Sequence, residues 1–199
     1  MRLPSPKRAL DVLVASLLLA ALSPLFAACA LAVAATSRGG VFYRQQRAGR
    51  GGVPFAMLKF RTMRRGADRE RAALATANES DGHLFKLRED PRITPVGRTL
   101  RRWSLDELPQ LVNVVRGEMS LVGPRPLPVE DSGYTGQARG RLLVLPGITG
   151  LWQVSGRSEL PWNEMVLLDL HYVDHHWVGM DLAILARTVP AVLTARGAH

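Results

Sequence analysis

The longest apolar run of the chain lies near its N-terminus. From Ala9 to Ala35 the sequence holds a single charged residue, Asp11. A run of about 20 apolar residues is long enough for a membrane-spanning helix. Ser23-Pro24 falls in the middle of the run, however, and a mid-helix proline removes a backbone hydrogen bond and bends the helix. The pattern therefore predicts two helices that meet at Ser23-Pro24, with the Ser23 hydroxyl bonded to a carbonyl freed by the break.

Basic residues flank this run on both sides. Arginine and lysine next to an apolar segment favour the cytoplasmic side, so both ends are predicted on one side and the segment dips into the bilayer and returns. The flanking residues are Arg2, Lys7, Arg8, Arg38, Arg44 and Arg47. A straight transmembrane helix and a cleaved signal peptide are the alternatives, although the run exceeds the about 7–15 residues of a signal-peptide core.

Short apolar segments and turn residues alternate along the rest of the chain. Residues 41–46 and 54–60 read as strands, and Gly49-Arg50-Gly51-Gly52 between them predicts a β-hairpin. The Ala, Arg and Glu content of residues 66–77 favours a helix.

Glycine and proline interrupt three further segments, which predict a loop at 78–95, a rigid loop at 117–128 and a turn at 146–150. Helical patterns follow the first and the last of these segments. The predicted helices are 96–103, 107–115, 162–176 and 180–194. An apolar stripe on the last one predicts packing in the core or, alternatively, contact with the bilayer surface. The stripe consists of Leu182, Leu185, Val189, Val192 and Leu193.

These elements predict a mixed α/β fold dominated by helices. The 199 residues allow one compact domain plus an anchor. We expect a re-entrant membrane hairpin at 1–37 and a catalytic domain at 38–199, with a short β-hairpin and amphipathic interfacial helices. The single cysteine, Cys29, excludes an internal disulfide and a cysteine-based metal site.

The positive charge is concentrated next to the apolar run. The formal net charge is +9, and residues 36–65 hold eight basic residues and no acidic one. Anionic lipid headgroups attract each such residue by about 1 kcal/mol. Nucleic-acid binding, suggested only by the isoelectric point near 10.9, is disfavoured because the rest of the chain is close to neutral.

Two adjacent carboxylates, Asp106 and Glu107, are the strongest candidates for chemistry. Pro109 is tolerated only in the first turn of a helix, which predicts that Asp106 stands at a helix N-terminus, where negative charge is favoured. An ionised carboxylate can attack phosphorus and form an acyl phosphate, and its neighbour could help to hold Mg²⁺. The alternative is a capping box formed by Ser104 and Glu107.

Basic residues from separate segments are candidates for phosphate binding. Prolines on both sides fix the backbone of Arg125, so its guanidinium is presented at little entropic cost. Lys59, Arg61 and Arg157 are further candidates, although Lys59 and Arg61 could be solvent-facing charges at a strand edge. Arg101, with its neighbour Arg102, could equally lie on a solvated or lipid-facing helix side. The sequence contains neither a Walker A loop nor a dinucleotide-binding glycine motif, which disfavours an ATP-driven or redox enzyme.

Several motifs, in order along nearly the whole chain, resemble those of the bacterial sugar transferase family, the small monotopic phosphoglycosyl transferases. After the apolar hairpin with Ser23-Pro24, the motifs are Lys59-Phe60-Arg61-Thr62-Met63, Asp90-Pro91-Arg92-Ile93-Thr94, Ser104-Leu105-Asp106-Glu107-Leu108-Pro109-Gln110-Leu111, Ser120-Leu121-Val122-Gly123-Pro124-Arg125-Pro126, Pro146-Gly147-Ile148-Thr149-Gly150, Gly156-Arg157, and Leu168-Asp169 with Tyr172-Val173. The chain resembles the minimal form of the family, without the multi-spanning N-terminal region of its longer members.

This resemblance implies a monotopic enzyme on the cytoplasmic face of the bacterial inner membrane. Such an enzyme moves a sugar-1-phosphate from a UDP-sugar to a polyprenol phosphate, usually undecaprenyl phosphate, and releases UMP to start glycoconjugate or polysaccharide synthesis. It further implies a phosphosugar ester on Asp106, a required Mg²⁺ near Asp106 and Glu107, and Arg125 in the phosphate and nucleotide pocket.

Partners and alternatives complete the expectations. Membrane lipids are expected partners, nucleic acid is not, and an oligomer is possible. A lipid-phosphate phosphatase using the same carboxylate would release inorganic phosphate, and a non-catalytic basic membrane scaffold would use the dyad merely as a helix cap. The sequence does not identify the sugar.

Overall fold

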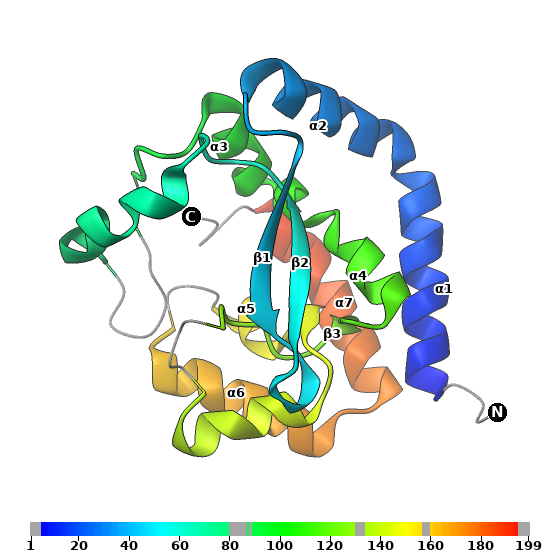
Figure 1. The fold of residues 1–199 in the computed structure, drawn as a ribbon. Coiled ribbons are helices and arrows are strands. Elements are labelled where there is room, and N and C mark those ends of the chain that lie inside the picture. The colour runs from blue at the N-terminus through cyan, green and yellow to red at the C-terminus, as the bar shows by residue number, and fades with distance from the viewer. Residues whose placement is uncertain (1–4, 80–86, 88, 130–133, 157–159, 195–199) are drawn as a thin grey trace.

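The chain folds around a small apolar core, with a bent helix pair along one side and a long β-hairpin across the front (Figure 1). In this computed structural model the described residues are 5–79, 87, 89–129, 134–156 and 160–194. Helices dominate, and the strands form two separate two-stranded sheets within the described residues. The predicted mixed, helix-dominated α/β class is thus confirmed.

The N-terminal apolar run forms two helices, α1 (Pro6–Ala21) and α2 (Ser23–Thr36), bent by 65° at the predicted break. The Ser23 hydroxyl donates to the Ala20 carbonyl at 2.8 Å, as expected for a carbonyl near the missing proline N–H. Among the described helices, none alone is long and apolar enough to cross a membrane; the bent pair together has the length and composition for it.

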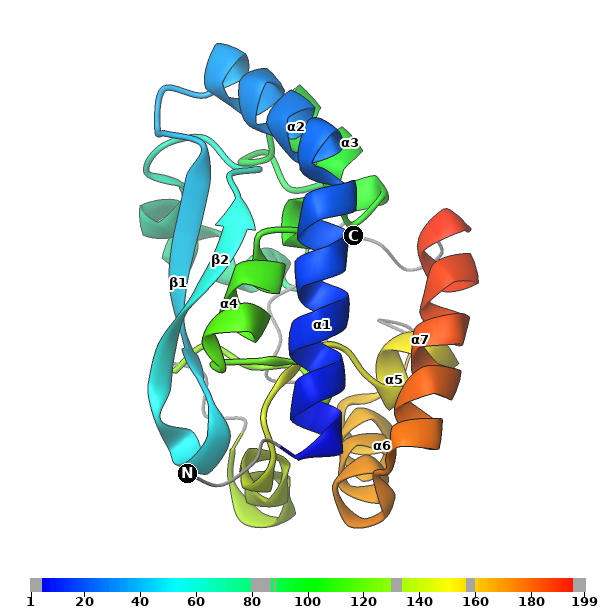
Figure 2. The same cartoon turned by 90° about the vertical axis from the view of Figure 1, so that its right-hand side faces the viewer.

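Charged residues of α1 attach it to the rest of the protein. Lys7 donates to Asp181 at 2.7 Å and to the Val122 carbonyl at 3.1 Å. The buried Asp11 carboxylate accepts the Leu121 N–H at 3.0 Å. Figure 2 shows α1 running between α4 and α7. We call Lys7, Asp11, Tyr172 and Asp181 the anchor cluster.

Arg8 fixes α1 to the end of a neighbouring helix. Its guanidinium donates to the carbonyls of Val114 and Val115 at 2.6 and 3.0 Å. These carbonyls lie in the last turn of α4 (Gln110–Arg116), where the negative end of the helix dipole favours a cation. Lys7 and Arg8, predicted from charge patterning to mark the cytoplasmic side, therefore also hold α1 against the folded domain.

The predicted hairpin is confirmed, with strands β1 (Phe42–Ala48) and β2 (Pro54–Phe60). They pair antiparallel from Phe42 opposite Phe60 to Ala48 opposite Pro54. A short 3-10 turn, η1 (Arg50–Gly52), connects them, and Gly51 and Gly52 adopt positive φ angles of 70° and 79° there. These are angles that glycine adopts without steric cost.

The glycine- and proline-rich segments contain regular structure that the sequence did not predict. Strand β3 (Ser120–Val122) lies within the predicted loop, and β4 (Gly147–Thr149) lies within the predicted turn. The two strands pair in parallel, and a short helix, α5 (Leu151–Ser155), follows. Each strand has three residues, which is too short for an alternating pattern to be visible.

Two helix predictions are wrong in detail. Residues 66–77 form two 3-10 helices, η2 (Ala67–Glu70) and η3 (Ala72–Ala77), and not one α-helix. The helix predicted from residue 107 begins at Gln110 as α4, because Leu105–Glu107 forms a separate 3-10 turn, η4. Helix α3 (Pro95–Arg102) agrees with the prediction within one residue at each end. The predicted loop at 78–95 lies partly outside the described residues.

Two helices complete the domain, α6 (Trp162–His175) and α7 (Val178–Leu193), after a long 3-10 helix, η5 (Gly136–Leu143). The core interpretation of the α7 stripe is wrong for three of its five members. Leu182, Val189 and Leu193 are 52%, 60% and 64% exposed, whereas Asp181 and Ile184 are buried. Asp181 faces inward because Lys7 and the Tyr172 hydroxyl bind its carboxylate, which a hydrophobicity pattern does not register.

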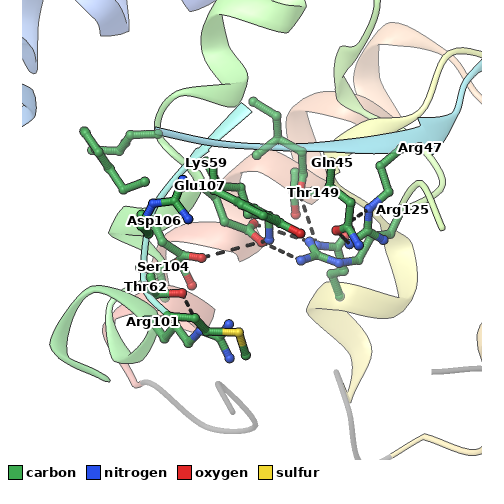
Figure 3. Close-up of a pocket in the computed structure, with 18 of the residues that line it drawn as sticks. Gln45, Arg47, Lys59, Thr62, Arg101, Ser104, Asp106, Glu107, Arg125 and Thr149 are labelled. Carbon is green, nitrogen blue, oxygen red and sulfur yellow. Dashed lines mark hydrogen bonds and ion pairs between the residues drawn. The ribbon is translucent and has the colours of Figure 1, made fainter. Parts of the chain in front are cut away.

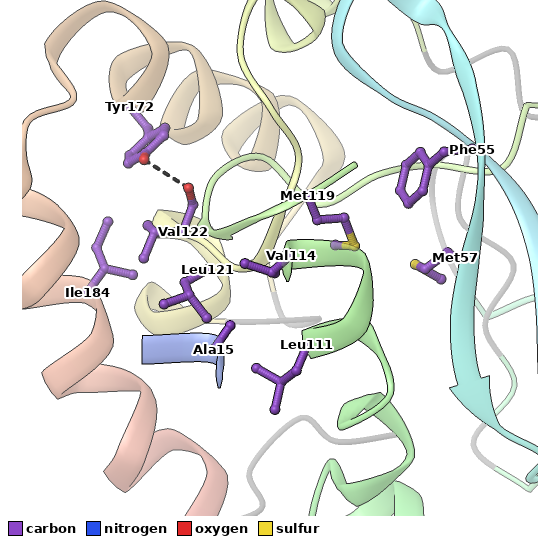
Figure 4. Packing of buried hydrophobic residues seen from close by; sticks show 10 residues of the cluster. All are labelled: Ala15, Phe55, Met57, Leu111, Val114, Met119, Leu121, Val122, Tyr172 and Ile184. Carbon is purple, nitrogen blue, oxygen red and sulfur yellow. Dashed lines mark hydrogen bonds between the residues drawn. The ribbon is translucent and has the colours of Figure 1, made fainter. Parts of the chain in front are cut away.

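The core fills the space between the hairpin, α4, β3 and α7 (Figure 4). A second apolar cluster joins α2 to the end of β2 and to α3 through Val33, Phe60 and Leu100. The main cluster consists of Ala15, Phe55, Met57, Leu111, Val114, Met119, Leu121, Val122, Tyr172 and Ile184. Because α1 contributes Ala15, the membrane hairpin predicted at 1–37 shares the core of the following residues.

Candidate active site

The two carboxylates lie in the 3-10 turn η4, at the junction between α3 and α4. Ser104 precedes them with a positive φ of 53°, and its side chain caps no helix. The capping-box alternative is therefore wrong. Asp106 is 7% exposed and lies before α4, not at its first residue, so α4 gives it no end-on dipole stabilisation.

Glu107 lies between two cations. Lys59, on β2, donates to Glu107 Oε1 at 2.9 Å. Arg125 donates to both carboxylate oxygens of Glu107, with its second contact at 3.3 Å to Oε2. This forked arrangement is the geometry that guanidinium adopts with carboxylates and phosphates. Asp106 lies farther from its counter-charge, with Oδ2 at 3.9 Å from Lys59 Nζ. We call Lys59, Asp106, Glu107 and Arg125 the dyad cluster (Figure 3).

The two carboxylates differ in acidity because their partners differ. Burial alone raises the pKa of Glu107, but Arg125 and Lys59 together hold it well below its usual range. Burial raises the pKa of Asp106 above its ordinary value; Lys59 opposes this shift and Glu107 adds to it. The low pKa of Glu107 favours its ionised form, and Lys59 is the group that most opposes the upward shift in the pKa of Asp106.

Lys59 and Arg125 reach the dyad from distant parts of the chain. Lys59 is the second-to-last residue of strand β2. Burial lowers the pKa of its ammonium group, and Glu107 opposes that shift. Arg125 follows β3, and the prolines at 124 and 126 restrict its backbone. The parallel pairing of β3 with β4 thus determines where Arg125 emerges.

A cavity of about 610 Å³ surrounds the dyad cluster, and its two sides differ in chemistry. The side formed by the hairpin and the segment after it is polar and basic, with Tyr43, Gln45, Arg47, Arg64 and Arg71. The lining contributed by α1, α4, α7 and the residues that cap α1 and η4 is mainly apolar, with Leu18, Leu22, Leu108, Leu111, Leu185 and Val192. The cavity therefore suits a charged polar molecule on one side and an aliphatic chain on the other.

The other basic candidates are placed differently from one another. Arg61 lines the cavity, but its guanidinium donates to the carbonyls of Gly40 and Phe42 at 3.0 and 3.3 Å. Arg157 lies outside the described residues. Arg101 lines the cavity, donates to Thr62 Oγ1 at 2.9 Å and has a pKa lowered by burial, whereas Arg102 is exposed. The solvent-facing alternative is thus correct for Arg102 and wrong for Arg101.

Two cavity residues escaped the sequence analysis in this role. Gln45 Oε1 accepts two hydrogen bonds from Arg47, at 3.1 and 2.6 Å, and both side chains lie beside Arg125 (Figure 3). The sequence indicates Arg47 only as a charge that flanks the apolar run. The period-two alternation along β1, which places Tyr43, Gln45 and Arg47 on one face, was the signal that could have identified them.

The donor set of the dyad suits a hard divalent cation. Within the described residues there is no cluster of three or more His, Cys, Asp or Glu that could form an all-protein metal cage. Mg²⁺, however, commonly uses only one or two protein carboxylates together with water and substrate phosphate. The lowered pKa of Glu107 favours the ionised form, which a metal ligand needs. Asp106 and Glu107 are thus chemically suited to that role.

A buried carboxylate pair, cations from separate elements and a cavity lined by both basic and apolar side chains would suit a phosphate ester that carries an apolar chain. The comparisons with known proteins identify the family. The model of the bacterial sugar transferase family matches residues 4–195, and the chain belongs to this family.

Relatives with known names are similar over almost the whole chain. The exopolysaccharide production protein ExoY of Sinorhizobium fredii is 45% identical over 97% of this chain and 88% of its own length. A protein of Caulobacter vibrioides named UDP-glucose:undecaprenyl-phosphate glucose-1-phosphate transferase is 42% identical over 97% of this chain and 72% of its own length. The undecaprenyl-phosphate galactose phosphotransferase of Salmonella typhimurium is 41% identical over 97% of this chain and 41% of its own length.

Proposed function

We propose that this sugar transferase moves a sugar-1-phosphate from a UDP-sugar to a polyprenol phosphate such as undecaprenyl phosphate, and releases UMP. The observation that carries the proposal is the position of Asp106, buried in the cavity, beside a Glu107 that Lys59 and Arg125 neutralise. The names of two relatives, which mention undecaprenyl phosphate and a hexose, support these substrates.

The reaction proceeds in two displacements at the phosphorus that carries the sugar. An oxygen of Asp106 attacks this phosphorus, and the bond to the bridging oxygen of the diphosphate breaks, so UMP departs with that oxygen. The product is a phosphosugar ester of Asp106. A phosphate oxygen of the polyprenol phosphate then attacks the same phosphorus, the bond to Asp106 breaks, and a polyprenyl diphosphate sugar forms.

The remaining charged residues bind and orient the reacting phosphates. Lys59 favours the ionised form of Asp106. Arg125, whose guanidinium donates to Glu107, would also contact the diphosphate. Arg61 and Arg157 remain candidate phosphate contacts. Asp106 and Glu107 would hold Mg²⁺, which neutralises charge on the transferring phosphoryl group when it is bound.

The two sides of the cavity suit the two substrates. The basic side along β1 suits the uridine diphosphate, and the apolar side between α1 and α7 suits the first isoprene units of the acceptor. We propose that the bent pair α1 and α2 enters and leaves the membrane on its cytoplasmic face, so that the acceptor phosphate reaches Asp106 while its chain stays in the bilayer. The exposed apolar residues Leu13, Leu17 and Leu31 of this pair support contact with lipid.

The test is incubation of the purified protein with Mg²⁺, undecaprenyl phosphate and a panel of UDP-sugars, with UMP as the readout. At least one donor is expected to yield UMP and a lipid-linked diphosphate sugar. Release of inorganic phosphate from the lipid would favour the phosphatase alternative instead. If no donor yields UMP while the protein binds membranes, the non-catalytic scaffold becomes the better account.

A further inference from the structure

The segment that presents Arg125 is held through its carbonyl groups. Pro124 and Pro126 have no N–H, so the backbone around Arg125 has few donors of its own. Each of the four carbonyls from Pro124 to Leu127 instead accepts a hydrogen bond from another element. The donors, in order, are the Gly147 N–H at 3.0 Å, the Arg141 guanidinium at 3.0 Å, the Arg47 guanidinium at 2.9 Å and the Ala48 N–H at 3.1 Å.

Arg141 is the donor to the carbonyl of Arg125 itself. It comes from η5, and its side chain is 2% exposed. Nε and the terminal NH2 group both lie 2.8 Å from Asp169 Oδ2 on α6. The rings of Tyr134 and Trp162 lie 5.7 and 5.3 Å from the guanidinium. Arg141 thus has a single fixed orientation, determined by Asp169 and two aromatic rings.

The orientation of Arg141 affects the dyad because Arg125 contacts both Arg141 and Glu107. The same residue that accepts from Arg141 through its carbonyl donates to Glu107 through its side chain. A shift of about 1 Å in a substrate-positioning group can cost about a hundredfold in rate. The flanking prolines restrict the backbone of Arg125, and the hydrogen bond from Arg141 to its carbonyl holds that peptide group against η5.

We propose that Arg141, anchored by Asp169, is a positioning residue that determines where Arg125 presents its guanidinium to the phosphates of the donor. The proposal rests on the proposed function only in taking the donor to be a nucleoside diphosphate compound. Arg141 does not touch the substrate; it acts through the main chain of Arg125.

The variants must separate positioning from folding. Arg141→Met alone leaves the Asp169 carboxylate buried without its cation, so it can fail to fold. The paired variant Arg141→Met/Asp169→Asn removes both charges, a change that buried ion pairs often tolerate. Arg141→Lys retains the positive charge, but its compact ammonium cannot contact Asp169 and the Arg125 carbonyl with a planar fork. Arg139→Met, at an exposed position of the same 3-10 helix, is the matched control.

The primary measurement is the affinity for UDP by calorimetry, in a cycle with Arg125→Ala. We expect the paired variant and Arg141→Lys each to weaken UDP binding about tenfold, which corresponds to about 1.4 kcal/mol. In the Arg125→Ala background the paired change should alter the affinity less than about twofold, because the group it positions is gone. Arg139→Met should bind UDP like the wild type.

A second measurement follows the backbone directly. Amide hydrogen exchange should accelerate at the amides of Arg125 and Leu127 in the paired variant, while β1, β2 and α4 keep their protection. Unchanged UDP affinity in a folded paired variant would overturn the proposal. So would an equal loss of affinity in the Arg125→Ala background, because that loss would then arise from general structural damage. If the cycle behaves as expected but no UDP-sugar yields UMP, the proposed function fails and the positioning role stands.

Discussion

The anchor cluster and the dyad cluster both contain buried charges, and they differ in how completely these charges are paired. In the anchor cluster Lys7 contacts Asp181 at 2.7 Å, and Asp11 accepts a backbone N–H at 3.0 Å. In the dyad cluster Glu107 is equally well paired, but Asp106 has its ion-pair contact within the described residues only at 3.9 Å, to Lys59. The short ion pair between Lys7 and Asp181 attaches α1 to the domain, whereas the longer contact of Asp106 leaves it the less tightly held carboxylate, as the proposed reaction requires.

The largest expected effect is on activity, from Asp106→Asn. Loss of the attacking oxygen should lower turnover by at least about a thousandfold. The free energy of unfolding should not decrease, since the substitution removes a buried charge that lies next to Glu107. UMP release and urea denaturation measure the two quantities. Asp68→Asn, at another carboxylate that lines the cavity, serves as the control; full turnover by Asp106→Asn would reject the assigned nucleophile.

In the anchor cluster we expect a substitution to lower stability and to leave turnover almost unchanged. Lys7→Met leaves Asp181 without its cation and should lower the free energy of unfolding by about 3 kcal/mol, the lower end for a buried pair. Turnover per folded molecule should change little, because Lys7 lies outside the cavity lining. Denaturation and single-turnover assays test this, and the double variant Lys7→Met/Asp181→Asn should recover most of the lost stability. A loss of turnover without a loss of stability would contradict the assignment of the anchor cluster to stability and of the dyad cluster to catalysis.

Lys59→Met should change the pH dependence of the reaction. Lys59 lowers the pKa of Asp106, so its removal raises that pKa further and leaves less ionised nucleophile at a given pH. The acid limb of kcat/KM should move to higher pH, with a loss of about tenfold at neutral pH, equal to about 1.4 kcal/mol. Arg44→Met, at an exposed position of β1, should leave the limb in place. An unmoved limb in Lys59→Met would show that another group ionises Asp106.

The smallest expected effect concerns the contact between α1 and the C-terminal end of α4. Arg8→Met removes the hydrogen bonds to the carbonyls of Val114 and Val115 and should cost about 1 kcal/mol of stability. Thermal unfolding should report it, with Arg116→Met, at an exposed position of α4, as the control. Loss equal to that of Lys7→Met would mean that Arg8 shares the anchor role fully.

The elements that the sequence predicted are those with local signals. The break at Ser23-Pro24, the hairpin with its glycine turn, and helices α3 and α6 follow from periodicity and turn residues. Strands β3 and β4 do not, because each has three residues and they pair across more than 20 intervening residues. The inward-facing Asp181 of α7 was likewise invisible, since its burial depends on Lys7 at the other end of the chain.

The candidate site was likewise predictable only where its residues carry a local sequence signal. Asp106, Glu107 and Arg125 were recognised as residues suited to phosphate chemistry, and the structure brings them together with Lys59. The expected helix dipole was replaced by a lysine from β2, because α4 begins only at Gln110. The contacts of Gln45 and Arg47 depend on hairpin register, which no motif records.

The central claim is that Asp106 becomes esterified by a sugar phosphate. The most direct measurement is the mass of the intact protein and of its peptides after incubation with Mg²⁺ and an accepted UDP-sugar, without polyprenol phosphate. The account predicts an added sugar phosphate on the peptide with Asp106, one UMP per adduct, its disappearance on addition of undecaprenyl phosphate, and no adduct in Asp106→Asn. UMP production that requires the lipid from the first turnover, with no adduct at any time, would contradict it and indicate direct transfer between the two substrates.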